Sequence, residues 1–436
     1  MSIQNSKVAA SETNYMAGQE LRAQAEALGA ELQDGFTELV SRLPRRILGP
    51  QALVDTLEGI NVVTGSRLLK ALAQNNSIAT LQLLPGPKPL QQVVDAAKAL
   101  GLSEEATAAA EAATNKFNEF IRVQSGDRSS LKAMLSAWLP EERREFETQR
   151  RQTIFKARHE LDGVSSELEL DSIFLHPSLE DGCLDIVNAK CLFGIDRIRP
   201  DTTVNLGTRR LTLQDSGELD AKDASLQRLP MNLDGELAHD GLHSVCLNEF
   251  CNSPPAPLKV DRFGQSMHYS LGPTGFGPAS KVDLVVAEVN KGELRGRIPS
   301  RDKPPHFWVT PEMCSRKLVF DLILHEDVFP SSSPTLYFYD TTGRGPAAVG
   351  DPERTLDQRQ FTHSVEVLGS DLRRMRLMEF PAYGTLKANI FEKMKWDGSK
   401  FRGYRVSITY PLTGVQVSLA FHPPSPGDSQ GRGSRS

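Results

Sequence analysis

Hydrophobic residues recur at helical spacing through the first third of the chain. Between residues 17 and 43 they follow one another mainly at steps of three and four, at Leu21, Ala25, Leu28, Leu32, Leu39 and Leu43. Such steps place side chains on one side of a helix, where they could pair two subunits or pack within their own domain. Because Gly29 and Gly35 interrupt this short stripe, we expect it to pack within its own domain.

Further helices are predicted up to residue 161. Helical periods recur in four later segments, at residues 90–101, 103–123, 131–140 and 141–161. The last of these segments is densely charged, which indicates a bridging helix with a largely solvated face. Residues 83–90 hold three prolines and a glycine, and this composition predicts a turn or tight reversal rather than a helix.

After residue 162 the pattern changes to β-branched and aromatic runs broken by proline, glycine and aspartate. Many of these runs alternate partly between polar and apolar residues, which is typical of antiparallel strands with one wet face. The predicted strands lie within residues 165–175, 183–195, 202–213, 257–263, 266–271, 282–289, 317–324, 335–342, 404–411 and 415–421. One late helix is predicted at 385–394.

The pattern as a whole predicts an α+β fold. An all-helical region containing a helix-turn-helix is expected over residues 1–161, and a mainly antiparallel β-rich region, which could comprise two subdomains, over residues 162–423. Residues 424–436 have the composition of a disordered tail.

Composition and charge narrow the possible functions. The chain has 436 residues, 39% hydrophobic and 24% charged, with five sparse cysteines that we expect to be reduced thiols. It lacks a leader pattern and any run of about 18 apolar residues, so we expect a cytoplasmic protein without a membrane segment. The net charge is -5, and residues 1–160 hold 19 Lys and Arg against 19 Asp and Glu. Any contact with nucleic acid must therefore be local.

Residues 49–75 predict two short helices joined by a glycine turn. The first helix is expected at 52–57, the turn at 58–61 and the second helix at about 62–74. Gly59 can adopt the positive φ that such a turn usually requires, and Asn61 can cap the second helix.

The two faces of the second helix differ in character. We expect an inner face, packed on the first helix, that consists of Val62, Gly65, Leu69 and Leu72. The opposite face would then present mostly short polar side chains and two cations, at Val63, Thr64, Ser66, Arg67, Lys70 and Gln74. Arginine and lysine can bind guanine or phosphate in a major groove, and threonine or serine can contact a base edge or a phosphate.

This stretch resembles the helix-turn-helix of bacterial winged-helix transcriptional regulators over about residues 45–90. The order of first helix, glycine turn and second helix carries the resemblance, together with the Pro/Gly-rich reversal where a wing could sit; Asp55 departs from the small residue usual in the first helix. The resemblance implies that Thr64, Ser66, Arg67 and Lys70 meet DNA while Arg45 and Arg46 hold its backbone. The segments LLPGPKPLQQVVDAA and WDGSKFRGYRVSITYP resemble parts of large, functionally uncharacterised bacterial proteins.

A second cluster could carry metal chemistry. His239, Asp240, His243, Cys246 and Cys251 lie within 13 residues. Zinc binds His and Cys, but this spacing matches no finger or ribbon pattern, so we expect loop histidines and small thiols without a metal or cofactor. His325 and Glu326 lack the second histidine of a zinc protease, and GxSxG and Walker-type motifs do not occur.

The sequence therefore predicts a non-enzymatic DNA-binding transcriptional regulator. Its β-rich region would sense a signal, form a homodimer or bind a partner. Two alternatives remain open: a protein-interaction or scaffold protein, and a metal-dependent enzyme that uses the cluster at residues 239–251.

Overall fold

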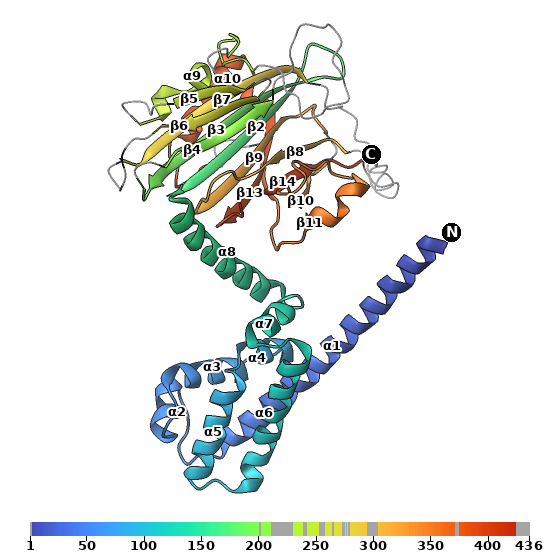
Figure 1. Ribbon diagram of the computed structural model, residues 1–436, viewed down its shortest axis with the longest axis vertical. Helices are drawn as coiled ribbons and strands as arrows, with labels where there is room; N and C mark the ends of the chain where they lie inside the picture. Colours follow the sequence, from blue (N-terminus) through green and yellow to red (C-terminus); the bar gives the residue numbers. More distant parts are fainter. Residues whose placement is uncertain are drawn as a thin grey trace, which may run out of the picture. The chain divides into compact units, whose positions relative to one another are not determined.

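The computed structural model describes residues 2–199, 202–210, 230–238, 242–252, 258–263, 266–272, 275, 277, 280–293, 304–330, 332–370 and 375–423. The chain divides into two compact units, Met1–Phe146 and Glu147–Ser436 (Figure 1). The first unit is helical and the second is rich in antiparallel sheet, which confirms the predicted α+β class. The division falls within the charged helix that the sequence placed at the end of the helical region.

The first unit contains helices and no strand over residues 2–146. Several helices start at side chains that accept a hydrogen bond from a backbone N–H of the first turn: Asn61, Asn76, Ser103 and Asp127. The helices are α1 (Ser2–Ser41), α2 (Pro50–Thr56), α3 (Val62–Leu72), α4 (Ser77–Leu83), α5 (Pro87–Ala99), α6 (Glu104–Gln124), α7 (Arg128–Ser136) and the first part of α8 (Pro140–Asp162).

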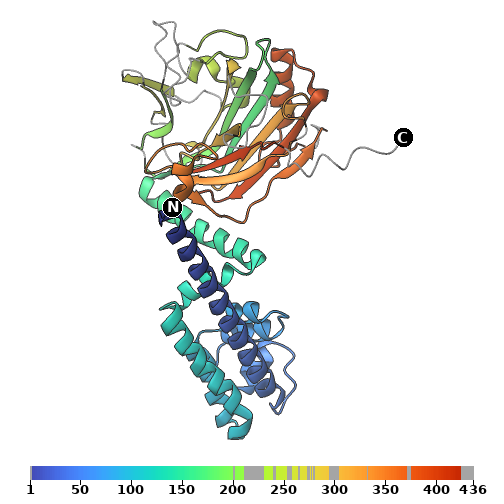
Figure 2. The same ribbon diagram turned by 90° about the vertical axis from the view of Figure 1, so that its right-hand side faces the viewer.

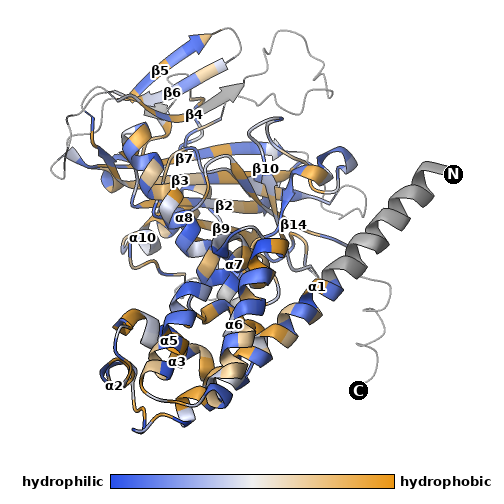
Figure 3. Cartoon of the chain, turned by 60° about the horizontal axis from the view of Figure 1, so that its bottom comes forward, coloured by the Kyte–Doolittle hydropathy of each residue, from blue (hydrophilic) through white to orange (hydrophobic). Residues whose placement is uncertain are grey.

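The core of the helical unit forms around the hydrophobic stripe of α1. Leu28, Leu32, Leu39 and Leu43 are buried in one cluster with residues of the other helices. Hydrophobic and hydrophilic residues alternate along α5 and α6, as expected of helices with one buried face (Figure 3). The expectation that the α1 stripe packs within its own domain is confirmed, and this stripe is not free to pair subunits.

Two sheets and a small third sheet form the second unit, shown from green to red in Figure 2. The large sheet pairs its strands antiparallel except for the parallel pair β2 and β9. It contains β1 (Val164–Ser165), β3 (Leu184–Arg197), β2 (Leu168–Pro177), β9 (Lys317–His325), β13 (Phe401–Thr409) and β12 (Glu366–Gly369), with β7 (Val282–Glu293) beside β3. Hydrophobic residues cover both of its faces.

The other sheets are smaller. The four-stranded sheet runs β11 (Gln358–Arg359), β10 (Thr335–Asp340), β14 (Val415–Ala420) and β8 (His306–Val309), and the three-stranded sheet runs β4 (Val204–Arg210), β6 (Ser266–Leu271) and β5 (Leu258–Phe263). The described residues of this unit also form the helices α9 (Leu242–Val245) and α10 (Tyr383–Met394) and the 3-10 helices η1 (Asn248–Phe250), η3 (Pro352–Asp357) and η5 (Gly398–Lys400).

The large sheet is the middle layer of the β unit. On one face Phe174 and Val187 pack against Ile390 and Phe391 of α10 in a single core. On the other face Phe320 shares a core with residues of the four-stranded sheet. All ten predicted strands occur, whereas β1, β8, β11 and β12 are too short to show a period of two in the sequence. No helix of the described residues is long and apolar enough to cross a membrane.

Candidate functional site

The predicted hairpin is present as α2 and α3. Pro50 starts α2, where a missing N–H has no cost, and Gly59 takes a φ of +90° in the turn. Asn61 then caps α3, because its Oδ1 accepts a hydrogen bond of 2.8 Å from the backbone N–H of Thr64. A Cβ at Gly65 would lie 3.3 Å from the backbone oxygen of Pro50, so the glycine allows the two helices to approach closely.

The buried face of α3 is rotated from the predicted one. Val62, expected inside, is 46% exposed, whereas Thr64, expected outside, is 6% exposed. Both predictions were wrong, because Leu68 and Leu69 are adjacent and the hydrophobic pattern offers two neighbouring stripes between which spacing alone cannot choose. Leu68 is fully buried and Leu69 only partly. Thr64 therefore belongs to the core rather than to an open surface.

Three predicted contact residues are exposed and carry unpaired charge. Arg45, Arg46 and Lys70 are exposed, and within residues 2–146 the structure gives them no ion pair; the same holds for Lys88. Ser66 and Arg67 are half-buried. Five other cations of the helical unit are each paired with a carboxylate, in the pairs Arg22–Glu26, Arg42–Glu38, Lys98–Glu111, Lys116–Glu31 and Arg122–Glu119.

Arg67 acts electrostatically on a half-buried arginine, Arg128, that the sequence did not reveal. The Nη2 of Arg128 donates hydrogen bonds of 2.8, 2.9 and 3.0 Å to the backbone oxygens of Leu81, Gln82 and Leu84. These carbonyls end α4 and lack helical partners, so a cation suits them. Burial and then the charge of Arg67 lower the pKa of Arg128 to about 10. An anion bound at Arg67 would relieve this repulsion.

The Pro/Gly-rich segment after the hairpin differs from the prediction. α4 ends at Leu83 and α5 begins at Pro87, so the turn is confined to residues 84–86 and the prediction of a turn through residue 90 was wrong. Proline is favoured at the first position of a helix, and this preference explains the difference. Because residues 2–146 contain no strand, the structure gives the helix-turn-helix no β wing.

In the cluster at residues 239–251, the thiols of Cys246 and Cys251 lie close together. His239 and Asp240 lie outside the described residues, as does the side chain of His243. The Sγ atoms of Cys246 and Cys251 are 3.6 Å apart. A hydrogen bond from Cys246 lowers the pKa of the Cys251 thiol to about 7. No group of three potential metal ligands occurs in the part of the chain that the structure describes.

A second polar cluster lies beneath α10. Arg405 donates two hydrogen bonds of 2.7 Å to Asp321, and the hydroxyl of Tyr383 donates one of 2.7 Å to the same carboxylate. Ser172 lies 2.8 Å from that hydroxyl, and Lys387, one turn after Tyr383, lies 4.4 Å from the centre of its ring. All five side chains are buried, so we assign the cluster to holding α10 on the sheet. The sequence feature that could have revealed this cluster is Asp321, an aspartate in the middle of the otherwise mainly apolar strand 317–324.

Comparison with known proteins assigns this chain to no family. No protein-family model matches the chain, and no curated protein sequence matches it. A solved structure of a "putative protease" from Parabacteroides distasonis matches 60% of this chain and 41% of that chain, at 9% identity and a TM-score of 0.24. The match thus spans less than half of that protein, and a score this low supports no conclusion about fold or activity.

Proposed function

We propose that the protein binds DNA through the α2–α3 hairpin and acts in the cytoplasm as a non-enzymatic transcriptional regulator. The observation that carries this proposal is the group of unpaired cations at the hairpin, Arg45 and Arg46 before α2 and Lys70 on α3. The β unit would sense a signal, form a homodimer or bind a partner. A homodimer would use a surface other than the α1 stripe, which is buried within the chain.

The contacts would be mainly to phosphate. Arg45, Arg46 and Lys70 can each neutralise a phosphate, and the three together give a salt slope of about -3, or about -4 with Arg67. Ser66 remains a candidate for a phosphate contact, and the positive end of the α3 dipole favours an anion near its first turn. Thr64 takes no part, since it is buried.

Fluorescence polarisation with mixed duplex DNA at several salt concentrations tests the proposal. The triple variant Arg45→Ala, Arg46→Ala and Lys70→Ala should bind more weakly and reduce the salt slope by about 3. A matched control, Arg22→Ala, Lys116→Ala and Arg122→Ala, removes three cations that are paired with carboxylates and should leave the slope nearly unchanged. Equal losses in the two triple variants, or no binding by the wild type at low salt, would contradict the proposal.

One observation favours a second function, binding of a protein. Leu48, just before α2, is 82% exposed, and Val63, in the first turn of α3, is 67% exposed. Exposed apolar residues of this kind suit a protein partner better than a phosphate backbone. The variant Leu48→Ser with Val63→Ser separates the two functions: DNA affinity should stay unchanged if the cations bind DNA. Absence of DNA binding by the wild type would favour the protein partner.

A further inference from the structure

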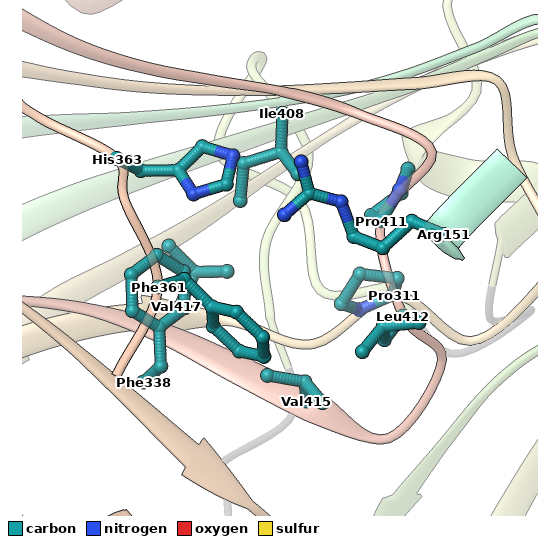
Figure 4. A pocket seen from close by; sticks show the side chains of 10 residues that line it. All are labelled: Arg151, Pro311, Phe338, Phe361, His363, Ile408, Pro411, Leu412, Val415 and Val417. Atoms are coloured by element: carbon teal, nitrogen blue, oxygen red, sulfur yellow. The ribbon is translucent and has the colours of Figure 1, made fainter. Parts of the chain in front are cut away.

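A pocket opens in the β unit beside α8. Apolar side chains from several strands and loops form its walls, among them Pro311, Phe338, Phe361, Ile408, Leu412 and Val417 (Figure 4). The empty space in the pocket and in the solvent at its mouth together measures about 260 Å³. The enclosed part is far smaller than the roughly 300–1,000 Å³ of pockets for drug-sized ligands, so it admits only a small group beside the guanidinium, and the rest of a ligand would lie at the open mouth.

One cation enters this apolar pocket. Arg151 of α8 is 5% exposed, and its guanidinium extends across the pocket toward His363 (Figure 4). Its Nη2 donates a hydrogen bond of 3.3 Å to the hydroxyl of Thr148. Its Nη1 lies 3.9 Å from Oε2 of Glu147, which is beyond hydrogen-bond distance. The Nε has no hydrogen-bond partner among the residues that the structure describes.

Among the residues that the structure describes, Glu147 carries the carboxylate that pairs with Arg151, and it compensates this charge only in part. Oε2 of Glu147 accepts hydrogen bonds of 3.1 and 2.9 Å from the backbone N–H and the hydroxyl of Thr362. The carboxylate is therefore held away from the guanidinium. A buried cation with an unused donor is costly unless an anion satisfies it, and the open pocket leaves room for that anion.

We propose that this pocket binds a small organic carboxylate with a compact apolar body, such as an aromatic acid. The two carboxylate oxygens match the fork of the Arg151 guanidinium, and the apolar body would lie against Phe338 and Phe361. A phosphate dianion fits less well, because the apolar walls cannot satisfy its remaining oxygens. This site goes beyond DNA binding and does not depend on it.

Calorimetric titration of the full chain with three probes tests the proposal. Benzoate should bind saturably, and benzamide, which has the same ring without the charge, should bind about tenfold or more weakly. Inorganic phosphate should not compete. Equal affinity for benzamide and benzoate would overturn the role of the charge, and a preference for phosphate would overturn the ligand class.

Variants locate the binding site. Arg151→Met keeps a long apolar side chain without the charge. It should weaken the binding of benzoate about 10- to 100-fold and leave the affinity for benzamide unchanged. Arg158→Met is the matched control, because Arg158 lies on the same helix, is exposed and is paired with Asp162. Leu412 is half-buried in the pocket wall, so Leu412→Trp narrows the pocket and should weaken the binding of both benzoate and benzamide. Unchanged benzoate affinity in Arg151→Met, or equal losses in Arg158→Met, would overturn the assignment.

Discussion

Two histidines meet where β2 and β9 end. The rings of His176 and His325 are 4.8 Å apart, and the ring of Phe401 lies 5.4 Å from that of His325. The Nδ1 of His325 accepts a hydrogen bond of 3.3 Å from the backbone N–H of Asp327. Burial and then the charge of His176 lower the pKa of His325, while Asp327 and Glu326 oppose this shift. The folded state therefore resists protonation of His325.

The lowered pKa makes stability depend on pH in one direction. In the unfolded chain the pKa of His325 is about 6.5, so the unfolded state takes up this proton before the folded state does. The stabilisation is present above about pH 6.5 and is lost as the pH falls through the lower, folded pKa. His325→Phe keeps an aromatic ring but cannot be protonated. Urea unfolding should show the wild type losing stability relative to His325→Phe below about pH 6.5; a constant difference from pH 8 to pH 5 would refute the prediction.

The candidate site shows for which residues the sequence predicts exposure or burial correctly. Arg45, Arg46 and Lys70 were predicted at the surface and lie there, because their charges cannot be buried without partners. Thr64 was misplaced because threonine is tolerated on either face and adjacent leucines leave the helix rotation open. The surroundings of Arg128 and Arg151 could not be recognised, since they consist of carbonyls and pocket walls that other segments supply.

At the scale of elements, the glycines of α1 are contact points between helices. A Cβ at Gly29 would overlap the backbone oxygen of Ser77 at the start of α4, and one at Gly35 would lie 2.9 Å from the backbone nitrogen of Ala110 in α6. In the sequence these glycines only interrupt a hydrophobic stripe. In α1 the spacing identified the buried face, but it did not reveal which backbone crosses that face.

Replacing Gly29 by alanine therefore reverses the usual effect of that change. Alanine favours a helix over glycine by up to about 1 kcal/mol, but here its methyl group would push α1 away from α4. We expect Gly29→Ala to lower the free energy of unfolding by about 1–3 kcal/mol. In contrast, a Cβ at Gly384 of α10 meets nothing, so Gly384→Ala should be neutral or stabilise slightly. Urea unfolding followed by circular dichroism measures the stability of both variants. A stabilising effect of Gly29→Ala would contradict the close approach of α1 to α4.

At the scale of the whole molecule, the two units have separate hydrophobic cores. Among the residues that the structure describes, the buried residues of one cluster all lie between Ala25 and Leu139. Those of the other clusters lie between Leu168 and Phe421. The change of periodicity near residue 162 predicts two regions, because a helical stripe and an alternating strand each need a core of their own kind. The two compact units divide earlier, between Phe146 and Glu147. Separate cores imply that each unit can lose stability independently.

Asp321 provides the test of that independence. Asp321→Ala leaves Arg405 buried without its carboxylate, which should destabilise the β unit by about 3–5 kcal/mol. Replacing both partners, by Asp321→Leu and Arg405→Met, should restore much of the loss because no unpaired charge remains. Hydrogen exchange followed by mass spectrometry should show faster exchange in β9 and β13 of Asp321→Ala, with α3 and α6 unchanged. Faster exchange in α3 and α6 as well would show that the two cores unfold as one cooperative unit.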